Sequence, residues 1–238
     1  MTPTTSHQRP TALVTGASRG FGRAVALALA DRGWRLVLDA RSRADLDTVV
    51  ALAPGSVTVA GDVTSPIHRE ALTAAVEVLG GLDLLVNNAS ELGPSPLPTL
   101  AAYPLDALRR VYETNVLAPL ALTQLLLPTL TASAGTVVNV SSDAAVEAYE
   151  GWGGYGSSKA ALDHLGRVLA AENASVRVYG FDPGDMRTDM HQRAFPGEDI
   201  SDRPLPETVV PALLRLLDER PLSGRYRASD LSAPAGTP

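Results

Sequence analysis

Apolar runs alternate with segments of helical periodicity along almost the whole chain. Short runs rich in Val, Leu and Ala predict strands at Ala12–Thr15, Arg35–Ala40, Val57–Ala60, Leu84–Asn87, Thr136–Ser141, Val176–Phe181 and Arg225–Arg227. Longer segments predict helices at Gly20–Arg32, Arg43–Leu52, Ile67–Leu79, Leu105–Leu130, Tyr155–Glu172 and Pro206–Asp218. This alternation predicts an α/β fold, in which a doubly wound parallel sheet of about seven strands carries helices on both faces.

A glycine, proline or polar residue follows each of five predicted strands. These residues are Gly16, Asp62, Asn88, Ser142 and Pro183. Ligands of such sheets bind in the crevice beyond the carboxyl ends of the strands. The five positions are therefore predicted to share one crevice.

The chain length and composition set limits on the class of protein. The 238 residues predict one domain over residues 11–231, with a flexible lead-in at 1–10 and a flexible tail at 232–238. A net charge of −6 disfavours a nucleic-acid surface. The absence of cysteine excludes disulfides and thiolate catalysis, and it fits a cytoplasmic location.

Membrane and metal binding are not expected from the sequence. No apolar stretch is expected to approach the roughly 20 residues of a membrane span, and residues 1–10 lack the apolar segment of a signal peptide. The histidines show no spacing typical of metal ligands, so no metal site is predicted.

Lys159 is the single lysine of the chain, and it lies four residues after Tyr155. Positions i and i+4 share one helix face, so both side chains can face one cavity. A compact ammonium beside a phenol favours the phenolate and is expected to lower the tyrosine pKa. The pair is thus a candidate proton donor and acceptor, although a chance pair on a solvated helix face would look the same.

A glycine-rich turn joins the first predicted strand to the first predicted helix. It runs Thr15-Gly16-Ala17-Ser18-Arg19-Gly20-Phe21-Gly22. Glycines let the backbone approach a pyrophosphate, and a helix N-terminus supplies free N–H groups and the positive end of a dipole. In this context the turn predicts phosphate binding.

Six motifs in this order resemble the short-chain dehydrogenase/reductase family over roughly residues 11–227. They are the turn, which is similar to TGxxxGxG; Asp62-Val63; Asn87-Asn88-Ala89, with Ser90 in place of a glycine; the spacing of Asn115 and Ser142; Tyr155 with Lys159; and Pro183-Gly184 with Thr188.

The resemblance implies a Rossmann-type fold and hydride transfer between a nicotinamide cofactor and a carbonyl or alcohol. It implies that Tyr155 donates the proton, Ser142 stabilises the carbonyl oxygen, Lys159 also binds the ribose, and Asn115 holds a relay water. The implied cofactor contacts are Gly16, Ser18, Arg19, Gly20, Phe21, Gly22, Arg41, Asp62, Val63, Asn88, Ala89, Tyr155, Lys159, Pro183, Gly184, Met186 and Thr188.

Within the family, three segments are most similar to the sepiapterin reductase and benzil reductase branch. They are residues 151–155, residues 182–190 and Ser223-Gly224-Arg225-Tyr226. That branch reduces carbonyls of small, often aromatic molecules with neighbouring oxygens. Ala228 occupies the place where a carboxylate anchors the pterin of sepiapterin reductases, so pterin specificity is not expected.

The second predicted strand favours NADP over NAD. The aspartate of NAD-dependent members would fall on Ala40, and Arg41 follows, as in many NADP-dependent members. Strand alternation should turn Asp39 away from the side that Ala40 faces. Arg19 is a second cation placed to reach a 2′-phosphate, although both arginines could be ordinary surface charges.

The remaining expectations concern assembly and rival functions. Helices at Leu105–Leu130 and Tyr155–Glu172 are apolar on more than one face, and the family pairs these helices between subunits, so a homodimer or homotetramer is expected. A non-catalytic, cofactor-binding regulatory protein is the alternative from another class. A sugar-nucleotide epimerase or dehydratase is disfavoured because few residues follow Pro183.

Overall fold

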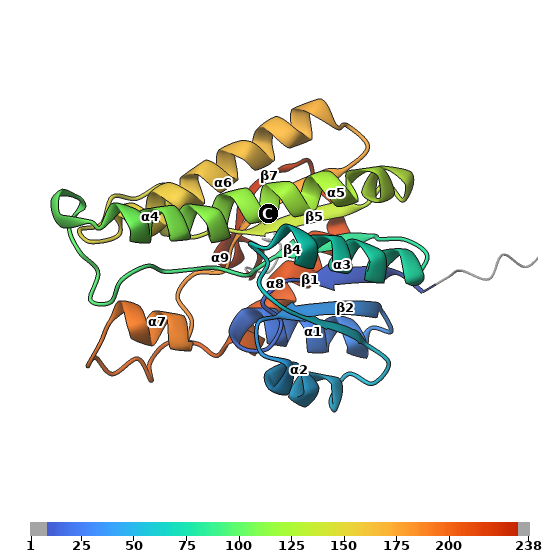
Figure 1. Ribbon diagram of the computed structural model, residues 1–238, viewed down its shortest axis with the longest axis horizontal. Coiled ribbons are helices and arrows are strands. Elements are labelled where there is room, and N and C mark those ends of the chain that lie inside the picture. The colour runs from blue at the N-terminus through green and yellow to red at the C-terminus, as the bar shows by residue number, and fades with distance from the viewer. Residues whose placement is uncertain (1–8, 233–238) are drawn as a thin grey trace, which may run out of the picture.

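A parallel sheet of seven strands forms the centre of the computed structural model, which describes residues 9–232 (Figure 1). The strands are β1 (Thr11–Val14), β2 (Arg35–Ala40), β3 (Val57–Ala60), β4 (Leu84–Asn87), β5 (Thr136–Val140), β6 (Arg177–Asp182) and β7 (Gly224–Arg227). Their order is β3-β2-β1-β4-β5-β6-β7, and every neighbouring pair is parallel. The predicted doubly wound Rossmann-type sheet is confirmed.

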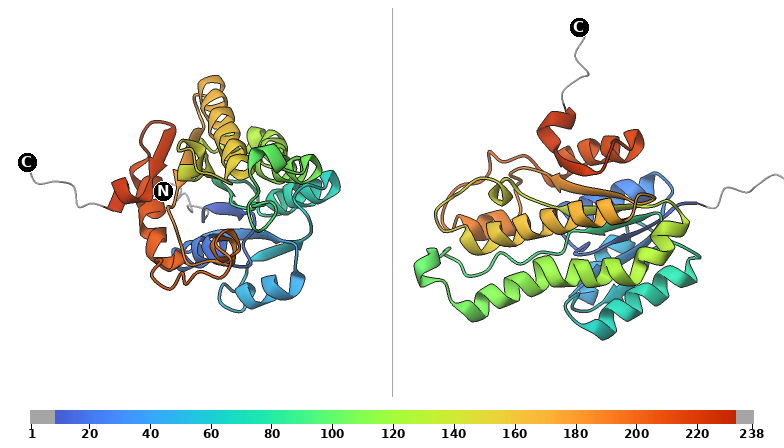
Figure 2. Two further views of the ribbon diagram at one scale, coloured as in Figure 1. Left: turned by 90° about the vertical axis from the view of Figure 1, so that its left-hand side faces the viewer. Right: turned by 90° about the horizontal axis from the view of Figure 1, so that it is seen from above.

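Helices cover both faces of the sheet (Figure 2). One layer contains α1 (Gly20–Asp31), α2 (Arg43–Val50) and α8 (Pro206–Glu219). The other contains α3 (Pro66–Val78), α5 (Ala118–Ala132) and α6 (Gly153–Glu172). The shorter helices are α4 (Leu105–Tyr112), α7 (Asp189–Ala194) and α9 (Ala228–Ser232), with 3-10 turns at Leu100–Ala102 and Asp143–Ala145.

Strand alternation divides the core into these two layers. Ala12 and Val14 of β1 pack in the layer of α1 and α8, whereas Leu13 packs in the layer of α3 and α5. All four β1 residues are buried. Burial on both faces explains why the strands are continuously apolar rather than alternating between apolar and polar residues.

The long helix predicted at Leu105–Leu130 is interrupted. A π-helical turn at Glu113–Leu117 separates α4 from α5. Such turns are rare and often mark functional positions. Here the turn contains Asn115, one of the candidate site residues, so a residue that disfavours regular helix coincides with the irregular turn.

Two short helices do not appear among the predicted elements. Residues of α7 are mostly polar, and the helix begins where the Thr188 hydroxyl accepts a hydrogen bond from the His191 N–H. Helix α9 begins at Ala228, directly after β7, and packs against α8. Helices this short carry too few periodic positions to be recognised in sequence.

The segment from Leu105 to Ala132 corrects the expectation that no apolar stretch approaches a membrane span. These 28 residues form one helical run that is, by length and composition alone, apolar enough to cross a membrane. Leu122, Leu126 and Leu130 are fully buried and pack in the core layer of β4 and β5. Burial against the sheet explains these apolar positions, and the absence of membrane binding stays a prediction.

The N-terminal end of the described chain adjoins the sheet. The Pro10 carbonyl accepts a hydrogen bond of 2.8 Å from the Arg35 N–H, so the chain joins the sheet before β1 begins. Residues 1–8 and 233–238, which make up most of the predicted lead-in and tail, lie outside the described residues.

Candidate active site

A cavity of about 840 Å³ lies at the carboxyl ends of the strands. The predicted site residues that line it are Gly16, Ser18, Arg19, Gly20, Phe21, Arg41, Asp62, Val63, Asn88, Ala89, Ser142, Tyr155, Lys159, Pro183, Gly184, Met186 and Thr188. Gly22 and Asn115 do not line the cavity. Strand order reverses between β1 and β4, and this is the point at which open α/β sheets place their ligands.

Thr15 and Asn88 bind the loops after β1 and β4 to each other. The Thr15 hydroxyl accepts hydrogen bonds of 3.0 Å from the N–H groups of Asn88 and Ala89. The Asn88 amide donates to the carbonyls of Thr15 and Gly16 at 2.9 and 3.1 Å. Asn88 therefore holds the glycine-rich turn through the carbonyls of Thr15 and Gly16.

Two glycines of the turn permit this close approach. A Cβ on Gly16 would lie 2.9 Å from the Cα of Ala89, and Gly16 has a φ of +65°. A Cβ on Gly22 would lie 2.5 Å from the Gly16 carbonyl oxygen. Gly22 therefore supports the turn without facing the cavity.

The first turn of α1 fits a pyrophosphate. No side chain caps this helix N-terminus, and its first turn holds no acidic residue. Its N–H groups and the positive end of its dipole are thus available to an anion. Phe21 lines the cavity, yet its ring is buried and stacks on Phe181 at a centroid distance of 5.8 Å.

At the other end of the cavity, Asp39 lines the wall and is paired with a histidine. Its Oδ1 lies 2.6 Å from Nε2 of His68 on α3, and both side chains are buried. Ala40 packs in the opposite core layer, as the predicted alternation requires. Arg41 is exposed at the cavity wall, and Arg19 forms an exposed ion pair with Asp189 at 3.3 Å.

Tyr155 and Lys159 are both buried at the cavity, and Lys159 Nζ lies 5.4 Å from the centre of the Tyr155 ring. Burial raises the pKa of Tyr155 well above its usual value, with the Ser90 hydroxyl acting in the opposite direction and Asp182 and Asp143 adding to the rise. The expectation that the Tyr155 pKa lies below its usual value is therefore wrong for the protein without cofactor and substrate, because desolvation disfavours the phenolate.

Burial acts on the lysine as well. It lowers the pKa of Lys159 to about 8, against a smaller opposing effect of Asp163. Lys159 Nζ donates a hydrogen bond of 2.7 Å to the Val140 carbonyl, which fixes the ammonium at the end of β5. The lysine is therefore poised to change charge at mildly alkaline pH.

The Ser142 hydroxyl lies at the carboxyl end of β5 and points at its neighbour. It donates a hydrogen bond of 2.9 Å to Oδ1 of Asp143 and accepts one of 3.2 Å from the Ala144 N–H. The other Asp143 oxygen accepts from the Tyr149 hydroxyl at 3.1 Å. A ligand that needs the Ser142 proton must compete with this carboxylate.

The Asn115 side chain has no capacity left for a water. Its Oδ1 accepts from the Ser90 hydroxyl at 3.2 Å and from the Glu91 N–H at 2.7 Å. Its Nδ2 donates to the Glu91 carbonyl and to the Ser158 hydroxyl, both at 2.9 Å. These four bonds use the full capacity of a primary amide, so the Asn115 side chain ties the loop after β4 to α6.

Apolar and aromatic side chains form the wall near Tyr155. The Trp152 ring packs edge-on against Tyr155 at a centroid distance of 5.7 Å and lies tilted against Phe195 at 5.9 Å. Leu92 and Met190 belong to the same cluster. Trp152 lines the cavity.

The sequence matches a known family model. The model described as short chain dehydrogenase matches residues 10–199, which is most of the chain. The chain belongs to the short-chain dehydrogenase family.

Relatives and solved structures agree with this family. Human L-xylulose reductase (Homo sapiens) is 34% identical over 238 residues, covering 94% of each chain. Sepiapterin reductase of Mus musculus is 39% identical over 199 residues, covering 76% of each chain. A short-chain dehydrogenase of Shigella flexneri, solved in complex with NADP, superposes with a TM-score of 0.86 at 30% identity over 92% of this chain and 97% of that one.

Several contacts that shape the candidate site of this short-chain dehydrogenase belong to no recognised sequence motif. Ser90 and Ser158 hold Asn115 from two different elements. Asp182 binds the Gly184 N–H through Oδ1 at 3.0 Å and thereby shapes the Pro183-Gly184 turn. The position of Asp182 directly before Pro183-Gly184 was the one available signal for these contacts.

Lys159→Met should stabilise the fold at pH 7 while removing the candidate ammonium. Lowering the lysine pKa from 10.5 to about 8 corresponds to about 3 kcal/mol of destabilisation when the group is charged, and the lost bond to Val140 offsets about 1 kcal/mol. Between pH 8 and 10.5 the unfolded wild type binds more protons, so its stability rises with pH and the advantage of Lys159→Met should shrink. Melting temperatures of both proteins at pH 7 and pH 9.5 check this, and a less stable variant at pH 7 would contradict it.

Proposed function

We propose that this short-chain dehydrogenase is an NADP-dependent carbonyl reductase or alcohol dehydrogenase. The observation that supports this most is that Ser142, Tyr155 and Lys159 line the same cavity as the glycine-rich turn. A proton donor, an oxygen-stabilising hydroxyl and a pyrophosphate site thus open onto one space. NADP(H), when bound, supplies or accepts the hydride.

Tyr155 is the proton donor in this proposal. Burial keeps the phenol protonated at neutral pH, as a proton donor requires, but it also makes the phenol a weaker acid, so proton transfer would need the positive charge of Lys159 to act on the phenol once substrate and cofactor are bound. Oxidation of an alcohol would need the phenolate and therefore favours alkaline conditions. Lys159, fixed by the Val140 carbonyl, supplies the positive charge beside the phenol and would bind the nicotinamide ribose.

Ser142 stabilises the negative charge that grows on the carbonyl oxygen. Its hydroxyl donates to Asp143, so it must rotate toward the substrate when a carbonyl arrives. Asp143 can keep its bonds to the Ala144 N–H and the Tyr149 hydroxyl during this rotation. Asn115 contributes by holding the loop after β4 against α6.

The adenosine end of the cavity supports NADP rather than NAD. Asp39, the carboxylate that could bind the ribose hydroxyls, is bound to His68 and buried. Exposed Arg41 and Arg19 line the same region and would meet a 2′-phosphate. The Shigella flexneri relative was solved with NADP, which agrees with this assignment.

The substrate we propose is a small carbonyl compound, aromatic or with two neighbouring oxygens. Trp152, Phe195 and Met190 offer an apolar and aromatic surface beside Tyr155. The similarity to sepiapterin reductase and L-xylulose reductase agrees with a reductase of small carbonyl compounds.

A turnover assay tests the proposed function. Purified protein with NADPH should reduce at least one member of a panel of diketones, quinones, aldehydes and ketoses, and the loss of NADPH absorbance measures the turnover.

Tyr155→Phe should abolish turnover and largely spare cofactor affinity. Lys159→Arg should also fail, since a guanidinium cannot replace the compact ammonium. Cofactor binding without turnover on the whole panel would instead favour the non-catalytic regulatory protein.

Arg41→Ala tests the cofactor assignment. A phosphate clamp should favour NADPH over NADH by at least about tenfold in kcat/KM, or about 1.4 kcal/mol, and the substitution should remove most of that preference. Measuring both cofactors with one accepted carbonyl decides the point. Equal efficiency of the wild type with NADH, or no response to the substitution, would count against NADP.

We also propose a homodimer or homotetramer. Leu117 and Leu125 of the Leu105–Ala132 run and Val168 of α6 are exposed apolar side chains, and these helices lie side by side (Figure 2). An assembly would bury them. Light scattering at micromolar concentration should show a dimer or tetramer, and a monomer would refute this proposal.

A further inference from the structure

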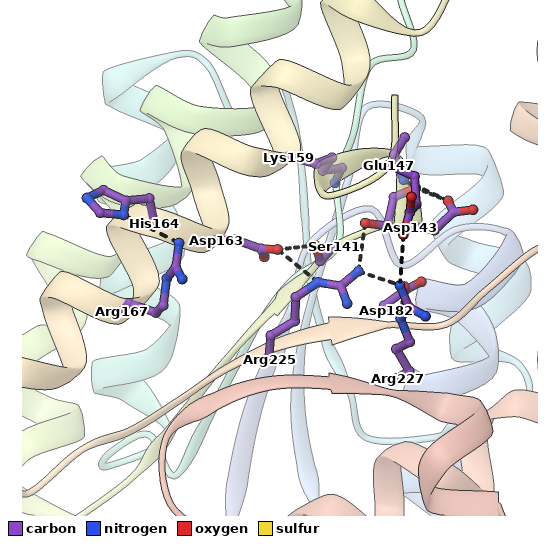
Figure 3. Close-up of polar contacts among 12 residues, drawn as sticks. Ser141, Asp143, Glu147, Lys159, Asp163, His164, Arg167, Asp182, Arg225 and Arg227 are labelled. Atoms are coloured by element: carbon purple, nitrogen blue, oxygen red, sulfur yellow. Dashed lines mark hydrogen bonds and ion pairs between the residues drawn. The ribbon is translucent and has the colours of Figure 1, made fainter. Parts of the chain in front are cut away.

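One guanidinium connects three elements next to the candidate active site (Figure 3). Arg225 of β7 donates from Nη2 to the Ser142 carbonyl at 2.9 Å and to Oδ2 of Asp182 at 2.7 Å. Its Nε donates to Oδ2 of Asp163 at 3.1 Å. Arg225 thus contacts the second residue after β5, the last residue of β6 and the middle of α6.

Both carboxylates that hold Arg225 are themselves bound to the site. Asp182 accepts the Gly184 N–H through its other oxygen, at 3.0 Å. Asp163 accepts the Ser141 hydroxyl at 2.7 Å. Asp163 also lies one helical turn after Lys159, on the same face of α6. The guanidinium is therefore fixed between two anchored groups, and the Ser142 carbonyl is its third acceptor.

The sheet leaves space for this cluster at Gly180. The register places Gly180 of β6 beside Arg225 of β7. A Cβ on Gly180 would lie 2.7 Å from Oδ1 of Asp163 and 3.8 Å from Cγ of Arg225. Asp163 and Asp182 are buried, so each needs a cation or hydrogen-bond donors to remain charged there.

We propose that Arg225 is a positioning residue, which orients the Ser142 hydroxyl by holding the Ser142 carbonyl in place. The peptide that follows Ser142 leads into the 3-10 turn of Asp143–Ala145, and it is this turn that presents the Asp143 carboxylate to the Ser142 hydroxyl. Fixing the carbonyl fixes the plane of that peptide and the direction of the side chain beside it. The inference rests on the proposed function of Ser142.

Lysine would not replace arginine in this role. The guanidinium reaches three acceptors on three elements with its rigid planar fork, whereas an ammonium is a point charge on a flexible stem. Arg227 lies farther from the same carboxylate, at 3.8 Å from Oδ2 of Asp182, and reaches Glu147 at 3.9 Å. Arg227 is therefore placed to balance the negative charge of Asp182, and it is not placed to hold Ser142.

Kinetics of Arg225→Met and Arg225→Lys test this role. Each should lower kcat at least about tenfold while the Kd of NADPH changes less than about threefold. Arg32→Met is the matched control, because it removes a remote arginine that binds both oxygens of Asp218, and its kcat should stay near wild type. If Arg225→Met does not fold, the kcat and the Kd of Arg225→Lys alone decide the test. An unchanged kcat in the Arg225 variants would overturn the proposal.

A double-mutant cycle of Arg225→Met with Ser142→Ala separates an effect of Arg225 on the Ser142 hydroxyl from a general destabilisation of the protein. If Arg225 acts through the Ser142 hydroxyl, the loss caused by Arg225→Met should shrink at least about threefold once that hydroxyl is gone. If Arg225→Met lowers kcat by the same factor with and without the Ser142 hydroxyl, the positioning role of Arg225 is wrong.

Hydrogen exchange gives a readout that needs no substrate. The peptide covering residues 140–146 should exchange faster in Arg225→Met than in Arg32→Met. Equal exchange would overturn the positioning role. A wild type without turnover on any carbonyl would instead count against the proposed function, and the exchange result would still decide whether Arg225 holds this segment.

Discussion

The contact between the loops after β1 and β4 is the constraint on which the candidate site depends. Strand order reverses there, so the helices that follow β1 and β4 depart to opposite faces and leave a crevice. The crevice binds a ligand only if the two loops hold each other at close range. Hydrogen bonds of Thr15 and Asn88 supply that hold, and the missing Cβ atoms of Gly16 and Gly22 make the approach sterically possible. A uniform parallel sheet without this contact would have the same core and no pyrophosphate site.

The opposite side of the crevice is organised by buried charge. Lys159, Asp163 and Asp182 are nearly inaccessible to water, and Arg225 is the cation that joins the two carboxylates. Burying ionised groups costs free energy that hydrogen bonds only partly return. A fold selected for stability alone would place apolar side chains there. In this protein the charges hold the Ser141 hydroxyl, the Ser142 carbonyl and the Pro183-Gly184 turn in place.

Irregular backbone also serves the site. The π-helical turn at Glu113–Leu117 interrupts an otherwise continuous helix at Asn115, whose amide then reaches both the loop after β4 and Ser158 of α6. A regular helix would rotate the residues on one side of the turn relative to the other and disturb either the apolar contacts of α5 or the amide bonds of Asn115. One local defect therefore lets a single helical run serve the core and the crevice.

Local pattern alone determined the sheet, its parallel sense and the crevice, because apolar periodicity and the turn residues after each strand depend only on neighbouring positions. The Tyr155 and Lys159 pair and the glycine-rich turn were found for the same reason, since their spacing along the chain is their signature. The tertiary structure decided what distant residues do to one another. Burial, which no spacing encodes, raised the pKa of Tyr155 where the neighbouring lysine was expected to lower it. The bonds of Asn115, the pairing of Asp39 with His68 and the contact of Arg225 with Ser142 join residues separated by 24 to 83 positions. Such contacts exist only once strands and helices have packed, because their energies depend on distance and solvent exclusion in three dimensions.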